Sequence, residues 1–133
     1  MKRQIALSLG AAALLIAATA SPASAGTAHN SGSGTIWTGS DGTVLCYTSI
    51  ENRDYDNHHS DVKGRFESHV GFGCQGWLER KSDEYNWTRV SNNYFISDGQ
   101  HASTAWHWNG GSAQSRVCIV LTANGEKVCS TGL

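Results

Sequence analysis

Short runs of β-branched and aromatic residues alternate with turn-forming residues along most of the chain, and the densest run lies near its C-terminal end. Residues 116–130 hold two apolar stretches on either side of Ala123, Asn124 and Gly125. An Asn-Gly pair between apolar runs is a strong hairpin signal, because both residues tolerate positive φ angles. The pattern therefore predicts two antiparallel strands that fold back on each other at this point.

The length of this turn decides whether Cys118 and Cys129 can form a disulfide. A two-residue turn places them diagonally, roughly 7–8 Å apart, at or beyond the reach of a disulfide. A three-residue turn places them on opposite faces of the hairpin. A four-residue turn over residues 122–125 places them directly opposite each other, with Cα atoms about 4.5–5.5 Å apart. We favour the four-residue turn, because the bridge then needs no distortion.

The remaining patterns predict short strands, with turn signals about every 8–12 residues. The polar residues 51–64 are predicted to form a long surface loop or a loop with a short helical turn, and Asp98 and Gly99 a second hairpin turn. No helical periodicity is sustained, so we predict an all-β fold, a small disulfide-stabilised antiparallel sandwich or barrel. The predicted strands lie within residues 35–38, 43–50, 66–80, 85–90, 94–97 and 104–108.

The N-terminal 25 residues have the pattern of a secretory signal peptide. Lys2 and Arg3 precede an apolar run, and Ala23 and Ala25 provide the small residues that signal peptidase requires. Residues 26–34, rich in Gly and Ser and without periodicity, are predicted to be a flexible tail. Residues 35–133 are expected to form a single β domain, secreted and extracellular.

Cleavage of this signal would change the charge of the protein. The chain has 10 basic and 11 acidic residues, and loss of Lys2 and Arg3 leaves eight basic residues against 11 acidic ones. A mildly acidic surface without a Lys/Arg cluster argues against nucleic acid and anionic membranes as partners.

All four cysteines follow the predicted signal peptide, so they would reach an oxidising compartment, where an even number of cysteines suggests disulfides. Three connectivities are open, and we favour Cys46–Cys74 with Cys118–Cys129. Each bridge would stabilise the domain by roughly 2–4 kcal/mol, mainly through the unfolded chain.

The acidic and histidine-containing residues 54–61 are the best metal candidate, because carboxylates and imidazoles could surround a cation. The segment lacks the Gly and Glu of an EF-hand loop, since Arg65 stands where that Glu would be, and it lacks zinc-type His or Cys spacing. We therefore predict a solvated loop, with no metal and no cofactor.

Enzymatic candidates are weak as well. A histidine with a carboxylate could serve as general base and acid in a small secreted hydrolase or nuclease. No nucleophile motif is present, and the cysteines are assigned to disulfides. We therefore expect a non-catalytic protein. The residues that the enzymatic alternative would use are His69, His101 and His107, with Glu51, Glu67 or Glu79.

Trp106 and Trp108 lie two residues apart and therefore point to the same side of a predicted strand. They could form an aromatic platform for sugar rings, which would make the protein a carbohydrate-binding module. We favour packing into the core, because Trp is the largest core side chain, and His107 would then point outward.

The N-terminal tail also has a functional interpretation. A flexible, Gly-rich segment could become ordered on a partner and add to the edge of the partner's sheet, with Ile36 and Trp37 as anchors. The residues predicted to contact a partner are Gly32, Gly34, Thr35, Ile36, Trp37 and Thr38.

A signal peptide, a Gly/Ser extension and a compact disulfide-bonded β domain with a cysteine in its final hairpin together resemble a known layout. The layout is similar to that of the adaptor subunit of the umbrella toxin particles, antibacterial complexes secreted by Streptomyces. The resemblance implies a non-catalytic adaptor that joins a lectin-like subunit to a stalk protein. It implies that residues 26–38 form the segment inserted into a partner.

Overall fold

The structure is a computed structural model that describes residues 27–38, 40–56, 59–81 and 86–133. In these residues the chain forms ten β-strands and no helix, which confirms the predicted all-β fold. None of the described residues belongs to a helix that could cross a membrane. The predicted signal peptide lies outside the described residues.

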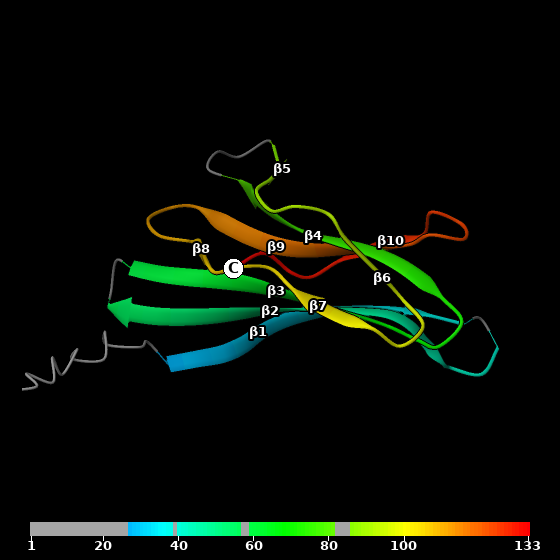
Figure 1. The fold of residues 1–133 in the computed structure, drawn as a ribbon. Coiled ribbons are helices and arrows are strands. Elements are labelled where there is room, and N and C mark those ends of the chain that lie inside the picture. Colours follow the sequence, from blue (N-terminus) through cyan, green and yellow to red (C-terminus); the bar gives the residue numbers. More distant parts are fainter. Residues whose placement is uncertain (1–26, 39, 57–58, 82–85) are drawn as a thin grey trace, which may run out of the picture.

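The strands form two antiparallel sheets (Figure 1). In the first sheet the order is β1-β2-β3-β7, and β8 also pairs with β3, beyond β7 along the same edge. The bounds are β1 Thr27–Trp37, β2 Val44–Asp56, β3 His59–Ser68, β7 His101–Ser103 and β8 His107–Trp108.

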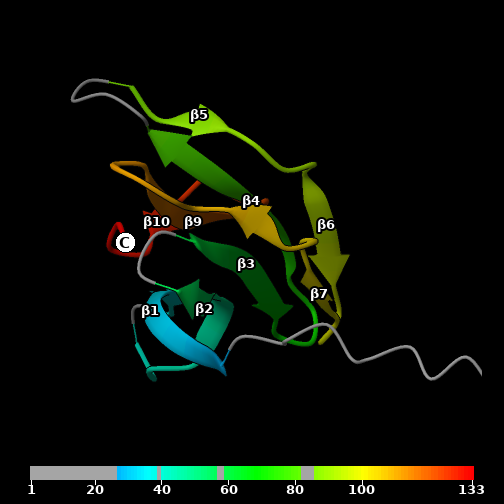
Figure 2. The same ribbon diagram turned by 90° about the vertical axis from the view of Figure 1, so that its left-hand side faces the viewer.

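In the second sheet the order is β10-β9-β4-β5, and β6 also pairs with β4. The bounds are β4 Gly73–Lys81, β5 Thr88–Arg89, β6 Tyr94–Ser97, β9 Gln114–Leu121 and β10 Lys127–Cys129. The two sheets form the two layers of a sandwich, which is visible when the molecule is turned (Figures 1 and 2).

The core lies between the sheets and consists of alternate residues from both. Phe66 on β3 is fully buried and packs against Gly76 on β4, where an added Cβ would lie 2.3 Å from the ring. The disulfide Cys46–Cys74 joins the two sheets through this core, with Cα atoms 6.1 Å apart. The other buried apolar residues are Ile36, Leu45, Ile50, Val62, Leu78, Ile96, Val117, Ile119 and Leu121.

The C-terminal hairpin has the predicted four-residue turn. The amide of Leu121 donates to the carbonyl of Glu126 at 2.8 Å, which leaves residues 122–125 as the loop. Cys118 then lies directly opposite Cys129, and the two residues form the second disulfide with Cα atoms 4.0 Å apart. Both predicted disulfides are therefore confirmed.

The prediction of a surface loop over residues 51–64 is wrong for the described residues, because residues 51–56 belong to β2 and residues 59–64 to β3. Glu51 pairs with Lys63 and Arg53 with Asp61 in the strand register. Their side chains point outward and form ion pairs across the strands, at 3.4 Å and 3.0 Å. When charged side chains form ion pairs on the outer face of two strands, the sequence of these strands is as polar as that of a loop. The prediction was wrong for this reason.

The prediction of a flexible tail over residues 26–34 is also wrong for the described part, which begins at Thr27. These residues belong to β1 and pair with β2 from Thr27 opposite Asp54 onward. Gly32 and Gly34 face the second sheet, where an added Cβ would lie 3.2 Å from Thr131 and 3.3 Å from Val128. The segment is a strand because it pairs with β2, which is distant in sequence. Its own residues show no apolar periodicity from which a strand could be predicted.

Three smaller predictions need correction. Asp98 and Gly99 form the expected turn with positive φ angles, but β6 and β7 on either side of it belong to different sheets. The predicted strand over residues 104–108 is reduced to β8. Of the one over residues 85–90, Tyr85 lies outside the described residues and the rest is reduced to β5.

Candidate functional site

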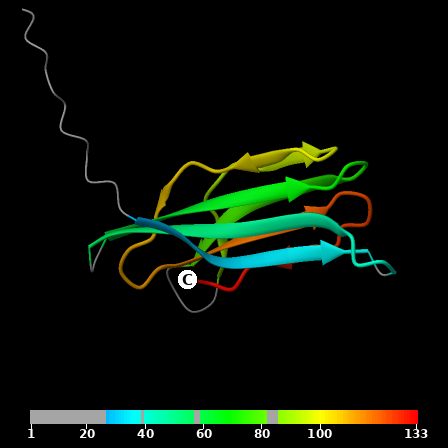
Figure 3. The same ribbon diagram turned by 90° about the horizontal axis from the view of Figure 1, so that it is seen from below.

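β1 is the edge strand of the first sheet and pairs with β2 on one side (Figure 3). It is 11 residues long and contains neither Lys, Arg, Asp, Glu nor Pro. Proteins commonly protect exposed edges with charged residues, Pro or bulges, because an open edge can pair with another chain. Two register shifts, after Asn30 and after Ile36, are the only such devices in β1.

The residues predicted to contact a partner divide between the core and the surface. Ile36 is 1% exposed and belongs to the core, so it cannot anchor a partner without unfolding β1. Trp37, by contrast, is 55% exposed at the end of the strand. Ser33 is exposed and Thr35 half-buried on the outer face of the sheet, between the inward-facing Gly32, Gly34 and Ile36.

A hollow of about 190 Å³ lies beside the C-terminal end of β1. Val44 is the register partner of Trp37, and Tyr47 is the partner of Thr35, so the hollow lies on the β2 side of the edge strand, across β1 from its free edge. Its lining residues are Val44, Leu45, Tyr47, Glu67, Ser68 and His69. The hollow has the size of one large side chain, and both apolar and polar residues line it.

The turn between β1 and β2 is fixed by Asp41. Its carboxylate accepts hydrogen bonds from the Thr38 hydroxyl and from the amide of Thr43, the latter at 2.9 Å. These bonds, the Thr38 one first, lower the pKa of Asp41 to about 2. The charged carboxylate therefore holds the turn at neutral pH, and with it the register of the exposed edge.

A second surface covers the outer face of the first sheet. Trp106 is half-buried and packs against two cations, with the Arg53 guanidinium 4.2 Å and the Lys63 ammonium 4.7 Å from its ring centroid. Trp108 is 52% exposed, and Tyr55 beside Arg53 is 38% exposed. The expectation that Trp106 and Trp108 pack into the core is therefore wrong, and His107, expected to point outward, is half-buried.

The charges around Trp106 on this outer face are paired. Glu51 accepts from Arg65 at 2.8 Å and lies 3.4 Å from Lys63. Burial raises the pKa of Glu51, but the hydrogen bond from Arg65 and the charge of Lys63 outweigh burial and hold the pKa below its ordinary value. The ion pairs therefore leave an aromatic surface with little net charge.

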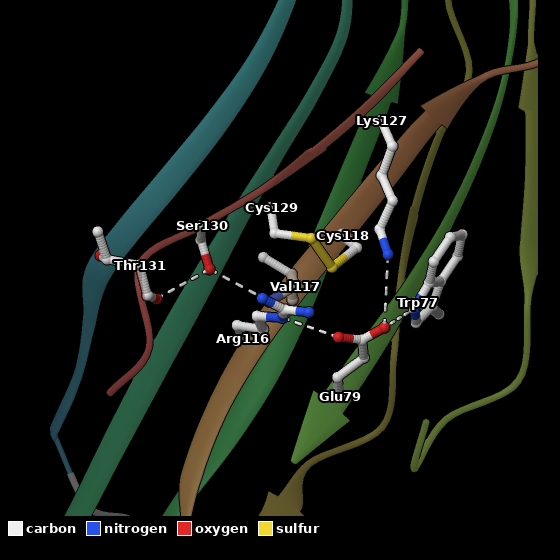
Figure 4. Close-up of a disulfide and its surroundings, with 9 residues drawn as sticks. All are labelled: Trp77, Glu79, Arg116, Val117, Cys118, Lys127, Cys129, Ser130 and Thr131. Carbon is white, nitrogen blue, oxygen red and sulfur yellow. Dashed lines mark hydrogen bonds and ion pairs between the residues drawn. A yellow bond between two sulfur atoms is a disulfide. The ribbon is translucent and has the colours of Figure 1, made fainter. Parts of the chain in front are cut away.

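The outer face of the second sheet carries a network around Glu79 (Figure 4). Glu79 is 7% exposed and accepts hydrogen bonds from the indole N–H of Trp77 and from Nε of Arg116, both at 2.7 Å. Lys127 lies 3.9 Å away, and the disulfide Cys118–Cys129 lies on the same face. Burial raises the pKa of Glu79, but the Trp77 and Arg116 hydrogen bonds and the nearby cations outweigh it and hold the pKa below its ordinary value.

The network is structural in character. Its cations also pack on indole rings, with Lys127 5.2 Å from the centroid of Trp77 and Arg116 4.3 Å from that of Trp87. The carboxylate of Glu79 lies near both sulfurs of the disulfide, but bonded sulfurs cannot bind a metal ion. Of the metal candidate predicted from the sequence, residues 54–61, Asn57 and His58 lie outside the described residues.

The histidines proposed for catalysis do not form a joined site. His101 is the cross-strand neighbour of Glu67, and His69 lies with Glu67 around the hollow. Within the described part of the chain, no hydrogen bond joins these three side chains. His107 lies elsewhere, on β8, where burial and the charge of Arg80 lower its pKa.

Sequence reasoning missed the hollow and the position of Arg80. The hollow depends on the pairing of β2 with β3, which no local pattern shows. Arg80 lies on the core-facing side of β4, in a run of charged residues that reads as a surface strand end. No protein-family model, curated protein or solved structure matches this chain.

Proposed function

We propose that the protein is a secreted, non-catalytic adaptor that binds an extended segment of another exported protein along the edge of β1. The observation that carries the proposal is the long, uncharged edge of β1. Two disulfides are compatible with an oxidising, extracellular setting. The resemblance in layout to the umbrella toxin adaptor supports an antibacterial complex as the setting.

Strand addition explains the chemistry of the site. Main-chain hydrogen bonds along an edge give affinity, and a pocket beside the edge gives specificity for one side chain of the partner. The hollow would provide that pocket for a long side chain that reaches across the end of β1, with Val44 and Tyr47 as its apolar contacts. The mode differs from the insertion of a free tail, because Ile36 keeps β1 fixed to the core.

The test compares two serine substitutions. Ser33→Lys adds a long charged side chain to the exposed face of the edge strand, where Lys opposes pairing with another strand. Ser112→Lys makes the same change in an exposed turn before β9 and is the matched control. A deletion of residues 26–38 is less useful, because it also removes Ile36 from the core.

Each tagged protein, starting at Gly26, is used to capture partners from the culture supernatant of the organism that encodes it, followed by mass spectrometry. We expect the same partner with the unchanged protein and Ser112→Lys, and at least tenfold lower recovery with Ser33→Lys. Thermal unfolding shows whether Ser33→Lys still folds. Equal recovery with both folded variants would show that the partner does not bind at β1.

Carbohydrate binding is the second candidate function, favoured by the outward position of Trp106 and Trp108. Trp37→Ala and Trp108→Ala form a matched pair, because the two side chains are 55% and 52% exposed. Strand addition predicts that only Trp37→Ala weakens capture of the protein partner. Carbohydrate binding predicts that glycans change the tryptophan emission and that only Trp108→Ala abolishes this change.

A further inference from the structure

Arg80 is the one basic residue in the described part of the chain with buried N–H groups and no anionic partner. Its Nε and Nη2 atoms are buried and form no hydrogen bond. Arg53, Lys63, Arg65, Arg116 and Lys127 all form ion pairs. Unpaired buried N–H groups of a cation are costly, so they point to a partner that the isolated chain lacks.

The two unpaired nitrogens have a specific geometry. Nε and Nη2 lie on the same edge of the guanidinium, the edge that donates two parallel hydrogen bonds to a carboxylate or phosphate. Arg80 lies on the core-facing side of β4, opposite Ser115 in the register with β9. The Ser115 hydroxyl donates to Asn109 at 2.7 Å, and its oxygen accepts no hydrogen bond from Nε or Nη2 of Arg80.

An aromatic ring lies over the guanidinium. The centroid of the Trp108 indole is 5.5 Å from Cζ of Arg80, and the ring is about half exposed. Gly110 allows the indole to lie against the backbone, since an added Cβ would be 2.8 Å from three of its atoms. Trp108 therefore covers the cation from the solvent side and presents an accessible aromatic surface.

His107, which neighbours Arg80, is not a second cation that would bind the anion in place of Arg80. Burial and the charge of Arg80 lower the pKa of His107 below its ordinary value, so the imidazole is neutral at pH 7. It can still donate one hydrogen bond. The cluster thus contains a fixed cation, a neutral donor and an exposed indole, and no carboxylate forms an ion pair with Arg80 in the described residues.

We propose that Arg80 and Trp108 bind a carboxylate carried on a sugar ring, a hexuronic acid unit of an acidic glycan. The carboxylate pairs with Nε and Nη2 of Arg80, and the sugar ring stacks on Trp108. Because both nitrogens are buried, the Trp108 side chain changes its rotamer as the ligand enters. The proposal rests on the second candidate function, because it uses the same aromatic surface, and it is independent of strand addition at β1.

The experiment follows amide and indole N–H signals by NMR while D-glucuronate, D-glucose or acetate is added to the protein from Gly26 onward. Glucose keeps the ring and lacks the carboxylate, whereas acetate keeps the carboxylate and lacks the ring. We expect saturable shifts at Trp108 with glucuronate, and at least tenfold weaker binding of glucose and of acetate. Arg80→Lys keeps the charge and loses the paired N–H groups, so glucuronate binding should fall about tenfold or more.

Arg89→Lys is the matched control, because this arginine lies over the ring of Trp77 on the same sheet and outside the proposed site. It should bind glucuronate as the unchanged protein does, and thermal unfolding identifies any variant that fails to fold. If Arg80→Lys is unstable, the comparison of glucuronate with glucose on the unchanged protein still tests the anion site, and Trp108→Ala, at an exposed position, tests the stacking contact. Equal binding of glucose and glucuronate would overturn the anion site and leave the neutral glycan candidate in place, whereas binding of neither sugar would overturn both.

Discussion

Replacing Glu79 with Gln should destabilise the protein substantially without changing its shape. The carboxylate accepts two hydrogen bonds, from Trp77 and Arg116, both at 2.7 Å. A Gln side chain has one oxygen and one NH₂ group, so it can keep one of these contacts and must present a donor to the other. Loss of one hydrogen bond to a charged group at a buried position costs about 2 kcal/mol.

The loss should be visible in thermal unfolding, followed by tryptophan fluorescence or near-UV circular dichroism. In a domain of this size, 1 kcal/mol corresponds to roughly 4–8 °C in Tm, so we expect Tm to fall by about 8 °C or more at pH 7. Glu126→Gln is the matched control, because Glu126 is exposed in the turn before β10. It should change the free energy of unfolding by less than about 0.5 kcal/mol.

The effect of Glu79→Gln should depend on pH in a defined direction. The pKa of Glu79 is lowered in the folded state from its ordinary value of 4.5. The stabilisation is therefore complete above about pH 4.5 and is lost as the pH falls through the folded-state pKa. The difference between the two proteins should shrink in acid. A difference that is absent at pH 7, or that does not shrink as the pH falls below 4.5 while both proteins stay folded, would refute the role assigned to the carboxylate.

Two further predictions concern the core and the β1–β2 turn. Gly76→Ala would place a Cβ 2.3 Å from the fully buried Phe66 ring and should cost about 1–3 kcal/mol in urea unfolding, whereas Gly73→Ala, with its nearest atom 3.5 Å away, should be nearly neutral. Thr38→Ala should raise the pKa of Asp41 from about 2 toward 3.8 in an NMR titration, because the Thr38 hydroxyl group provides its strongest hydrogen bond. In the unchanged protein the contribution of Asp41 should persist above about pH 4 and disappear as the pH falls toward 2.

Features with local causes could be predicted from the sequence. The hairpin of β9 and β10 depends on a turn of four residues and on two cysteines whose separation allows only certain registers. Turn geometry therefore favoured the bridge Cys118–Cys129, which the structure confirms, although the sequence left three connectivities open. The all-β class followed from many short β-branched and aromatic runs, which no helical period could explain.

Features that depend on long-range pairing could not be predicted. Lys63 and Arg53 gave residues 51–64 the polarity of a loop, although each pairs with an acid on the neighbouring strand. Trp106 lies outside the core because Arg53 and Lys63 cover its ring, and neither contact is local in sequence. The exposed candidate surfaces were therefore the least predictable part of the molecule.

The glycines of β1 led to the wrong prediction of a flexible tail, and they also bear on the proposed function. Gly34 lies so close to the second sheet that a Cβ would meet Val128 at 3.3 Å and the backbone of Cys129 at 3.4 Å. Small residues there let β1 lie directly over β10, so the composition that suggested flexibility serves close packing. One face of β1 packs against the second sheet, and one edge pairs with β2. A partner strand would therefore bind at the other edge. A side chain added at Gly34 would move the whole strand, whereas a change at Ser33 alters the exposed side alone. Ser33 is therefore the position at which partner binding and folding can be separated.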